Sequence, residues 1–293
     1  MIQGSSPLSI FDGMGFYSPI MVPKAFLLDL DGTLYQGGAA VPGAPEMLEE
    51  LRRGGVPFRL VTNTTSRPRR ILLGQLQGYG FRVAAEELFT AVSAGAGLAA
   101  ERGYQRLLPL MAAEALEDLD GFELAGGTSG RPPGRTPDAV IVGDLGPGWS
   151  YDLMQEAFIS LMDGAELIAL SRDRYWRKGD DLALDLGPFV AGLEYAAGVE
   201  AVIAGKPSPA FYDTVVRDLD SSGALPRGEI AMVGDDLWSD VEGARRAGLQ
   251  GWLVRTGKFR ADVLAASGLR PDRILDSISE LALDGPGAAP GPD

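Results

Sequence analysis

The sequence AFLLDLDGT, residues 25–33, indicates the architecture of the chain. Ala25 to Asp29 form an apolar run that ends in a carboxylate, as expected of a strand buried on both faces of a parallel sheet. Asp31 follows one residue later, and ligands of open α/β sheets bind beyond such strand ends. Two crowded carboxylates repel each other, so they need a cation or a shared proton, and Mg²⁺ is the hard cation suited to oxygen ligands. An ordinary Asp-Gly turn is the alternative for this stretch taken alone.

Similar apolar runs recur along the whole chain. They predict further strands at Pro57–Thr62, Leu107–Met111, Ala139–Val142, Glu166–Leu170, Ala201–Ile203, Ile230–Val233 and Gly251–Val254. Amphipathic segments between them predict helices, among them Ala44–Arg53, Asp152–Met162 and Pro209–Leu219. Gly121–Pro137 shows no periodicity and is predicted to be a long surface loop. This alternation predicts an α/β fold with a doubly wound, Rossmann-like parallel sheet.

Polar residues follow two more of these strands. Thr62 and Asn63 end one run, and a Thr hydroxyl with the amides beyond it can hold a phosphate oxygen. The alternative is a helix N-cap at residues 64–66. Lys206 follows another run and is one of only four lysines in the chain, so its ammonium is a candidate partner for phosphate or carboxylates. A solvated loop lysine is the alternative there.

The last such strand runs into the sequence GDDLWSD, residues 234–240. Asp235 is placed to ligate a metal from the strand tip. Asp240 lies five residues later, about one helical turn, where it can orient a ligand or the lysine. The alternative for Asp235, Asp236 and Asp240 is an acidic first helical turn favoured by the helix dipole.

The composition excludes several chemistries. The 293 residues include no histidine and no cysteine, and 26 basic against 40 acidic residues give a net charge of −14. Disulfides, thiolate zinc sites, cysteine nucleophiles and Ser-His-Asp triads are therefore excluded. The acidic balance argues against nucleic-acid binding. No apolar run reaches a membrane span and no secretory signal is evident, so a cytoplasmic protein is expected.

In their joint order, these motifs resemble those of the haloacid dehalogenase superfamily of phosphatases, across residues 24–283. Lys206 lies 144 positions after Thr62, and this spacing resembles that of the NagD-like subfamily IIA, in which a large α/β cap of the C2 type is inserted between the second and third motifs. The resemblance implies a core of residues 24–96 and 203–283 and a cap of residues 97–202. Residues 1–23 are expected to be a leader without fixed structure, with a true start at Met21 as the alternative, and residues 284–293 are expected to be a flexible tail.

The resemblance also implies a mechanism for a Mg²⁺-dependent phosphohydrolase. Asp29 is the nucleophile that forms an aspartyl-phosphate, and Asp31 is the general acid and then the general base. Thr62, Asn63 and Lys206 are implied to bind the phosphoryl group of a small phosphorylated substrate. The residues implied around Mg²⁺ are Asp29, Asp31, Asp235, Asp236 and Asp240, and the sequence leaves open which of the last two touches the metal. A homodimer through the cap is expected because relatives often form one.

Substrate choice is assigned to a cap loop. Ser171–Lys178 holds four cations and two aromatic residues, and we expect Arg174 and Tyr175 to face the active site and select the substrate. The alternative is a solvated hairpin turn.

Two other functions compete with this reading. Gly95–Ala100 satisfies a G-x-G-x-x-A dinucleotide fingerprint, with Glu117 and Asp118 about 20 residues on, which would suggest a nucleotide-dependent oxidoreductase. Close packing of small residues on a helix is the simpler explanation of that motif. A non-catalytic ligand-binding protein on the same fold is the other alternative, and the complete set of acidic motifs and Lys206 argues against it.

Overall fold

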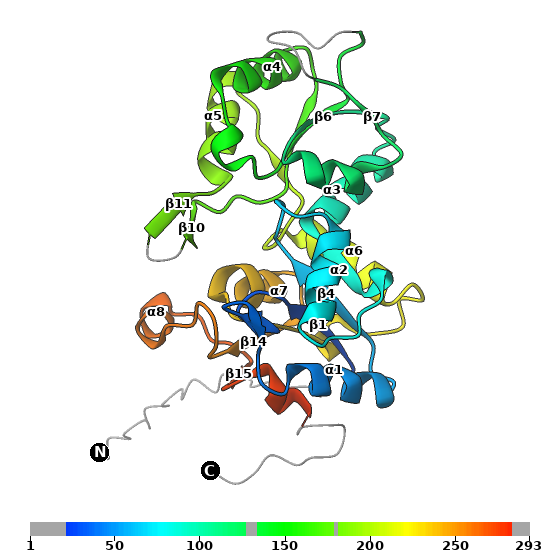
Figure 1. Ribbon diagram of the computed structural model, residues 1–293, viewed down its shortest axis with the longest axis vertical. Helices are drawn as coiled ribbons and strands as arrows, with labels where there is room; N and C mark the ends of the chain where they lie inside the picture. The colour runs from blue at the N-terminus through cyan, green and yellow to red at the C-terminus, as the bar shows by residue number, and fades with distance from the viewer. Residues whose placement is uncertain (1–21, 127–133, 179–180, 283–293) are drawn as a thin grey trace, which may run out of the picture.

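The computed structural model describes residues 22–126, 134–178 and 181–282. The predicted tail at 284–293 and nearly all of the predicted leader lie outside these residues. Two α/β units are stacked along the long axis of the molecule, and each is built around its own parallel sheet (Figure 1). No helix among the described residues is long and apolar enough to cross a membrane.

The larger sheet has six parallel strands in the order β15-β14-β13-β1-β4-β5. In chain order the strands are β1 (Ala25–Asp29), β4 (Phe58–Thr62), β5 (Leu88–Thr90), β13 (Ile230–Gly234), β14 (Gln250–Val254) and β15 (Arg273–Leu275). After β1, the next strands of the chain, β4 and β5, lie on one side of it. The later strands β13, β14 and β15 lie on the other side. The order therefore reverses between β1 and β13, and ligands of such sheets bind at this switch point.

Helices cover both faces of this core sheet, because alternate residues of each strand point to opposite sides. Phe26 and Leu28 pack with α1 (Ala44–Arg53), α2 (Arg69–Gly78) and η6 (Ile278–Ala282). Ala25 and Leu27 pack on the other face with α6 (Pro209–Leu219) and α7 (Gly243–Arg246). The sheet is therefore doubly wound, as predicted.

The cap is the second unit. Its five parallel strands follow the order β12-β9-β8-β6-β7. Their bounds are Arg106–Leu110 for β6, Glu123–Leu124 for β7, Ala139–Val142 for β8, Glu166–Ala169 for β9 and Val202–Ile203 for β12. Three helices accompany this sheet, namely α3 (Ala91–Glu101), α4 (Tyr151–Met162) and α5 (Gly187–Ala197). The predicted α/β core with an inserted α/β cap is confirmed.

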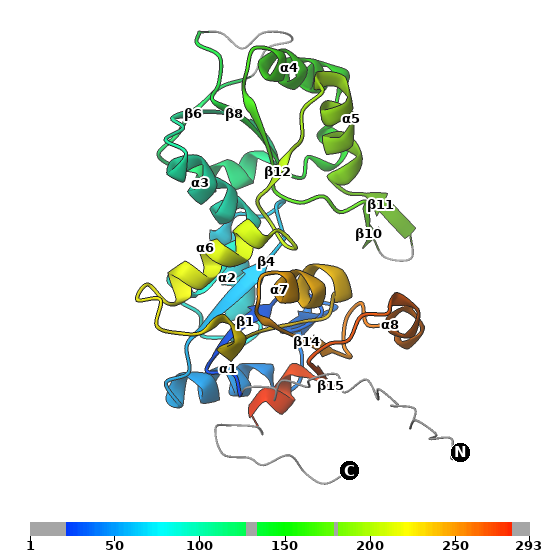
Figure 2. The ribbon, with the colours of Figure 1, turned by 180° about the vertical axis from the view of Figure 1, so that it is seen from behind.

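A hairpin of β10 (Tyr175–Lys178) and β11 (Asp181–Leu184) extends from the cap on the side where α8 (Ala261–Ser267) lies in the core (Figure 1, Figure 2). On that side, the hairpin is the part of the cap that extends toward the core.

Every predicted strand is present within one residue of its expected ends. The structure also contains elements that the sequence patterns do not predict: the short strands β5, β7 and β15, the small β2–β3 hairpin (Tyr35–Gln36 with Ala39–Ala40) and the β10–β11 hairpin. Strands of two to four residues are too short to show a period. The predicted loop at Gly121–Pro137 was partly wrong because it contains β7, and its residues 127–133 lie outside the described part of the chain.

The structure explains the dinucleotide-like motif as helix packing. Gly95 and Gly97 lie inside α3 and not in a turn before a helix, so no phosphate-binding turn is formed. A Cβ at Gly95 would clash with the side chains of Leu170 and Ile141 in the cap sheet. The glycine lets α3 approach that sheet closely. The predicted domain boundary at residue 97 falls within this helix.

Candidate active site

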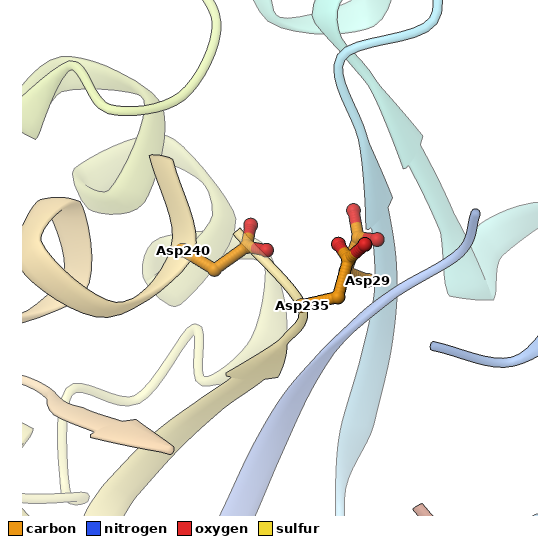
Figure 3. A group of neighbouring side chains, drawn as sticks. All are labelled: Asp29, Asp235 and Asp240. Carbon is orange, nitrogen blue, oxygen red and sulfur yellow. The ribbon is translucent and has the colours of Figure 1, made fainter. Parts of the chain in front are cut away.

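Three buried carboxylates converge at the switch point of the core sheet. Asp29 ends β1, Asp235 directly follows β13, and Asp240 lies in η5 (Leu237–Glu242), a π-helical segment. One oxygen from each lies within 4.8 Å of the others, and all three residues are buried (Figure 3). Asp29 and Asp235 lie 206 positions apart in the sequence. They meet here because β1 and β13 are paired neighbours.

Lys206 joins two of these carboxylates. Its Nζ donates to Asp29 Oδ1 at 2.5 Å and to Asp240 Oδ1 at 2.7 Å, and its side chain is only 3% exposed. Burial alone would lower the pKa of Lys206, but the two carboxylates outweigh it and raise the pKa above its ordinary value. The lysine is therefore a buried ammonium ion held against the predicted nucleophile, which rules out a solvated loop lysine.

Asn63 fixes the backbone of Lys206. The Asn63 side-chain amide donates to Lys206 O at 2.9 Å, and its oxygen accepts from Lys206 N–H at 2.8 Å. Gly205 sits at this crossing, where a Cβ would clash with the carbonyl of Leu170 and with Asn63. Asn63 thus positions the lysine in this structure, and direct binding of phosphate by Asn63 stays a prediction.

Thr62 ends β4, the other neighbour of β1, and is 3% exposed. Its hydroxyl accepts from Thr64 N–H at 3.1 Å and donates to the Thr64 hydroxyl at 3.0 Å, which holds the turn after the strand. The helix that follows begins at Arg69 with Pro68 as its N-cap. The alternative of a helix N-cap at residues 64–66 was therefore wrong.

Asp31 is exposed, whereas the three carboxylates of the cluster are buried. Partial burial raises its pKa, and the negative charge of Asp29 adds to this, while Lys258 and Arg67 act in the opposite direction. A raised pKa keeps a carboxyl group protonated to higher pH than usual, which favours a role as general acid.

Asp236 and Asp240 have different environments. Asp240 contributes an oxygen to the cluster and accepts from Asp236 N–H at 3.0 Å. Asp236 instead caps η5, accepting from Trp238 N–H at 2.9 Å and Ser239 N–H at 3.0 Å. It also accepts from Lys258 Nζ at 3.0 Å. Burial would raise the pKa of Asp236, but Lys258 and these N–H donors lower it to about 2.

The loop at residues 256–258 encloses Asp235 from the other side, and the sequence analysis assigned it no role. Lys258 N–H donates to Asp235 Oδ2 at 2.6 Å, and Thr256 Oγ1 donates to Gly32 O at 2.5 Å. Gly32 and Gly257 both have positive φ, and a Cβ on either would clash with the Asp235 carboxylate. The only signal in the sequence was Thr256-Gly257-Lys258 directly after a predicted strand.

The charge balance of the cluster fits a hard cation. Burial first, and then repulsion by Asp29, raise the pKa of Asp235 to about 8. Burial also raises the pKa of Asp240 to about 7, although Lys206 acts against it. Three carboxylates with one ammonium leave an excess of negative charge in a buried space, and protons or a divalent cation can offset it.

Arg174 and Tyr175 lie in the cap at the start of the β10–β11 hairpin, and both are exposed. The Arg174 guanidinium lies 5.9 Å from the centre of the Tyr175 ring. The structure does not bring either side chain into the carboxylate cluster. Asp185 follows β11 at the same base of the hairpin, where its N–H donates to Arg174 O at 3.2 Å. Burial raises the pKa of Asp185 to about 6, and the charge of Lys258 acts against this rise.

The core carries hollows at its surface. One of about 110 Å³ opens beside the carboxylates between η5 and α8, with Asp235, Asp236, Trp238, Lys258 and Phe259 among its lining residues. A larger one of about 760 Å³ lies near α1 and α2 and contains none of the predicted site residues. We therefore place the candidate active site at the carboxylate cluster.

Comparisons with known proteins agree with the motifs. Residues 26–125 match the family model described as haloacid dehalogenase-like hydrolase, and residues 203–281 match the one described as HAD-hydrolase-like. The chain is 42% identical to haloacid dehalogenase-like hydrolase domain-containing protein 2 of Rattus norvegicus over 82% of this chain and 87% of that protein. It is 33% identical to phospholysine phosphohistidine inorganic pyrophosphate phosphatase of Rattus norvegicus over 88% of this chain and 92% of that protein. Among solved structures, NagD from E. coli K-12 superposes with a TM-score of 0.76 at 27% identity, covering 89% of this chain and 98% of the other.

Proposed function

Since the chain belongs to the haloacid dehalogenase-like hydrolases and is a phosphatase of the NagD-like subfamily IIA, we propose that it hydrolyses a small phosphorylated compound through a covalent intermediate on Asp29, with Mg²⁺ as its cofactor. The observation that carries this proposal is the buried contact of Lys206 with Asp29 and Asp240 at the switch point, beside Asp235. A phosphate dianion repels a carboxylate nucleophile, so a nearby positive charge is what this chemistry requires.

Asp29 attacks the phosphorus atom. Its Oδ1 accepts from Lys206, which leaves Oδ2 to form the new O–P bond while the bond from phosphorus to the leaving group breaks. Asp31, with its raised pKa, donates a proton to the leaving atom. In the second step Asp31 takes a proton from water, the water oxygen attacks phosphorus, and orthophosphate leaves with the carboxylate of Asp29 restored.

The phosphoryl group is held by residues at the neighbouring strand ends. Thr62, at the end of β4, would turn its hydroxyl from the Thr64 hydroxyl to a phosphoryl oxygen and donate there. The Lys206 ammonium has three protons and uses two on carboxylates, so one is left for a phosphoryl oxygen. Asn63 keeps the lysine at that position through its backbone.

Mg²⁺ fits the three carboxylates. Asp29, Asp235 and the backbone carbonyl of Asp31 would hold it, with Asp240 and Asp236 as supporting residues. When bound, it supplies positive charge that stabilises the negative charge of the transferring group.

The substrate class is a small phosphorylated compound. The relative named for phospholysine, phosphohistidine and inorganic pyrophosphate makes N–P compounds and pyrophosphate worth testing beside sugar phosphates and nucleotides. We assign substrate selection to Arg174 and Tyr175 of the cap loop, so alanine at either residue is expected to change the ranking of substrates.

The test is the hydrolysis of p-nitrophenyl phosphate by the purified protein with Mg²⁺ and, in parallel, with EDTA. We expect turnover that requires Mg²⁺. A screen of phosphorylated metabolites then identifies the substrate. Absence of turnover on the whole panel, together with tight binding of one member, would instead favour a non-catalytic binding protein.

A further inference from the structure

The cap is hydrogen-bonded to the segment that carries the phosphate-binding residues. This segment, residues 62–70, runs from the end of β4 into the first turn of α2. Asp144 N–H in the cap donates to Thr65 Oγ1 at 3.0 Å. Asp118 Oδ2 in the cap accepts from Arg69 N–H at 2.9 Å. The position of the cap is thereby coupled to the segment that begins with Thr62.

The α2 helix has no cap of its own. Its N-cap residue is Pro68, which makes no side-chain cap bond, and its first turn contains no acidic residue. The first N–H groups of a helix lack partners within the helix and carry partial positive charge. Asp118 supplies both the missing acceptor and the missing negative charge, from 49 positions further along the chain.

Asp118 is held firmly on the cap side. It belongs to η2 (Ala113–Leu119), whose Ala115 and Leu119 are buried in the hydrophobic core of the cap. Asp118 itself is partly buried. A bond from this segment to the backbone of α2 therefore connects two packed elements and not two mobile side chains.

We propose that Asp118 is a positioning residue, which holds the cap at a fixed place over the catalytic carboxylates by capping α2 from across the cap–core boundary. Asp118 is one of the two acidic residues that suggested a dinucleotide fingerprint, and this contact gives it a different role. The kinetic test of this role rests on the proposed function, whereas the measurement of the cap position does not.

The neighbouring residue Glu117 is a matched control. It pairs with Arg70 across the same boundary at 3.2 Å, and their side chains are 40% and 70% exposed. Exposed ion pairs of this kind contribute little, so its loss is expected to leave the cap in place.

Two pairs of variants separate the hydrogen bond from other effects. Asp118→Ala removes the acceptor, whereas Asp118→Asn keeps an oxygen of the kind that N-caps favour. Arg69→Pro removes the donor at the first helical position, where proline is well tolerated, and Arg69→Ala keeps the N–H. Pro68 already has φ −68° and ψ 155°, the extended conformation that a residue before proline requires.

The position of the cap can be measured directly because the chain has no cysteine. Spin labels at Glu50→Cys on α1 and Met162→Cys on α4, both exposed residues, report the distance between core and cap. We expect the distance distribution to broaden in Asp118→Ala and in Arg69→Pro. It should match the unsubstituted chain in Asp118→Asn, Arg69→Ala and Glu117→Ala.

Kinetics provide the second readout. We expect KM for p-nitrophenyl phosphate to rise roughly fivefold in Asp118→Ala and Arg69→Pro, the size expected for loss of a typical N-cap, with a smaller change in kcat. Asp118→Ala and Arg69→Pro remove the same hydrogen bond. The variant that carries both changes should therefore show no larger rise in KM than either single variant.

Narrow, unchanged distance distributions in both Asp118→Ala and Arg69→Pro would overturn the proposal, as would an equal KM change in Glu117→Ala. If Asp118→Ala does not fold, Arg69→Pro against Arg69→Ala decides the same question. A chain without phosphatase activity would refute the proposed function, while the spin-label distances would still test the contact.

Discussion

Replacing Lys206 by methionine tests the electrostatics of the site. The change removes the ammonium that bonds Asp29 at 2.5 Å and Asp240 at 2.7 Å and keeps an unbranched side chain in a position that is 2% exposed. Removing one partner of a buried ion pair typically costs about 3–5 kcal/mol, because the other charge is left buried without compensation.

The geometry gives a similar magnitude. The cluster oxygens lie within 4.8 Å of one another. Two unit charges at that distance repel by about 3.5 kcal/mol at an effective dielectric constant of about 20. We therefore expect Lys206→Met to lose about 3–5 kcal/mol of stability in metal-free buffer at pH 8. This corresponds to a fall in Tm of roughly 6–10 °C at about 2 °C per kcal/mol.

The assay is thermal unfolding followed by circular dichroism in EDTA, and if core and cap melt separately the core transition is the one expected to move. Lys24→Met is the matched control, since Lys24 pairs with Glu229 at 2.7 Å but its side chain is 64% exposed. Its loss should cost less than about 1 kcal/mol. Mg²⁺ should recover part of the stability of Lys206→Met. A Tm equal to that of the unsubstituted chain at pH 8 in EDTA would refute the reasoning.

Three further predictions concern the same cluster. Asp29→Asn should abolish turnover without lowering Tm, since the amide cannot attack phosphorus and one negative charge is lost; phosphatase assays and melts check this, and normal activity would contradict it. Because the pKa values of Asp235 and Asp240 are raised from 3.8 to about 8 and about 7, the folded chain binds protons that the unfolded chain releases. Stability of the metal-free protein should therefore fall as pH rises from about 4 to 8, and less so with Mg²⁺, whereas a flat profile in EDTA would count against the raised values. Gly257→Ala should weaken Mg²⁺ binding about tenfold or more by displacing Asp235, as measured by Mg²⁺-dependent thermal shift. Gly37→Ala, with the same φ of 60° but no atom within 4 Å of the added Cβ, should not.

Much of the fold could be predicted from local patterns. Strands buried on both faces require continuous apolar runs, and β1, β8 and β13 show them clearly. Short edge strands such as β15 bury fewer residues and therefore leave no comparable pattern. The β10–β11 hairpin was missed because its first strand is rich in charged and aromatic residues, which indicate a loop as readily as a strand.

The site could be predicted only in part. Polar residues at or directly after the end of a buried strand stand out in the sequence, and this is why Asp29, Thr62 and Asp235 could be proposed as candidates. Thr256–Lys258 and Asp118 could not be assigned in this way. Their roles depend on which loops the folded chain places beside Asp235 and α2, and no local pattern contains that information.

The amino-acid composition establishes which chemical groups are available. Without histidine or cysteine, the acids and bases of this chain are carboxylates, amines and hydroxyls, and their order along the chain identified the family motifs. The environment of each carboxylate comes from the folded chain. Asp235 and Asp236 are adjacent and identical in type, yet the pKa of the first is raised to about 8 and that of the second is lowered to about 2. The physical reason is that Asp235 is buried facing other carboxylates, whereas Asp236 receives the Lys258 ammonium and the N–H groups of a helical turn.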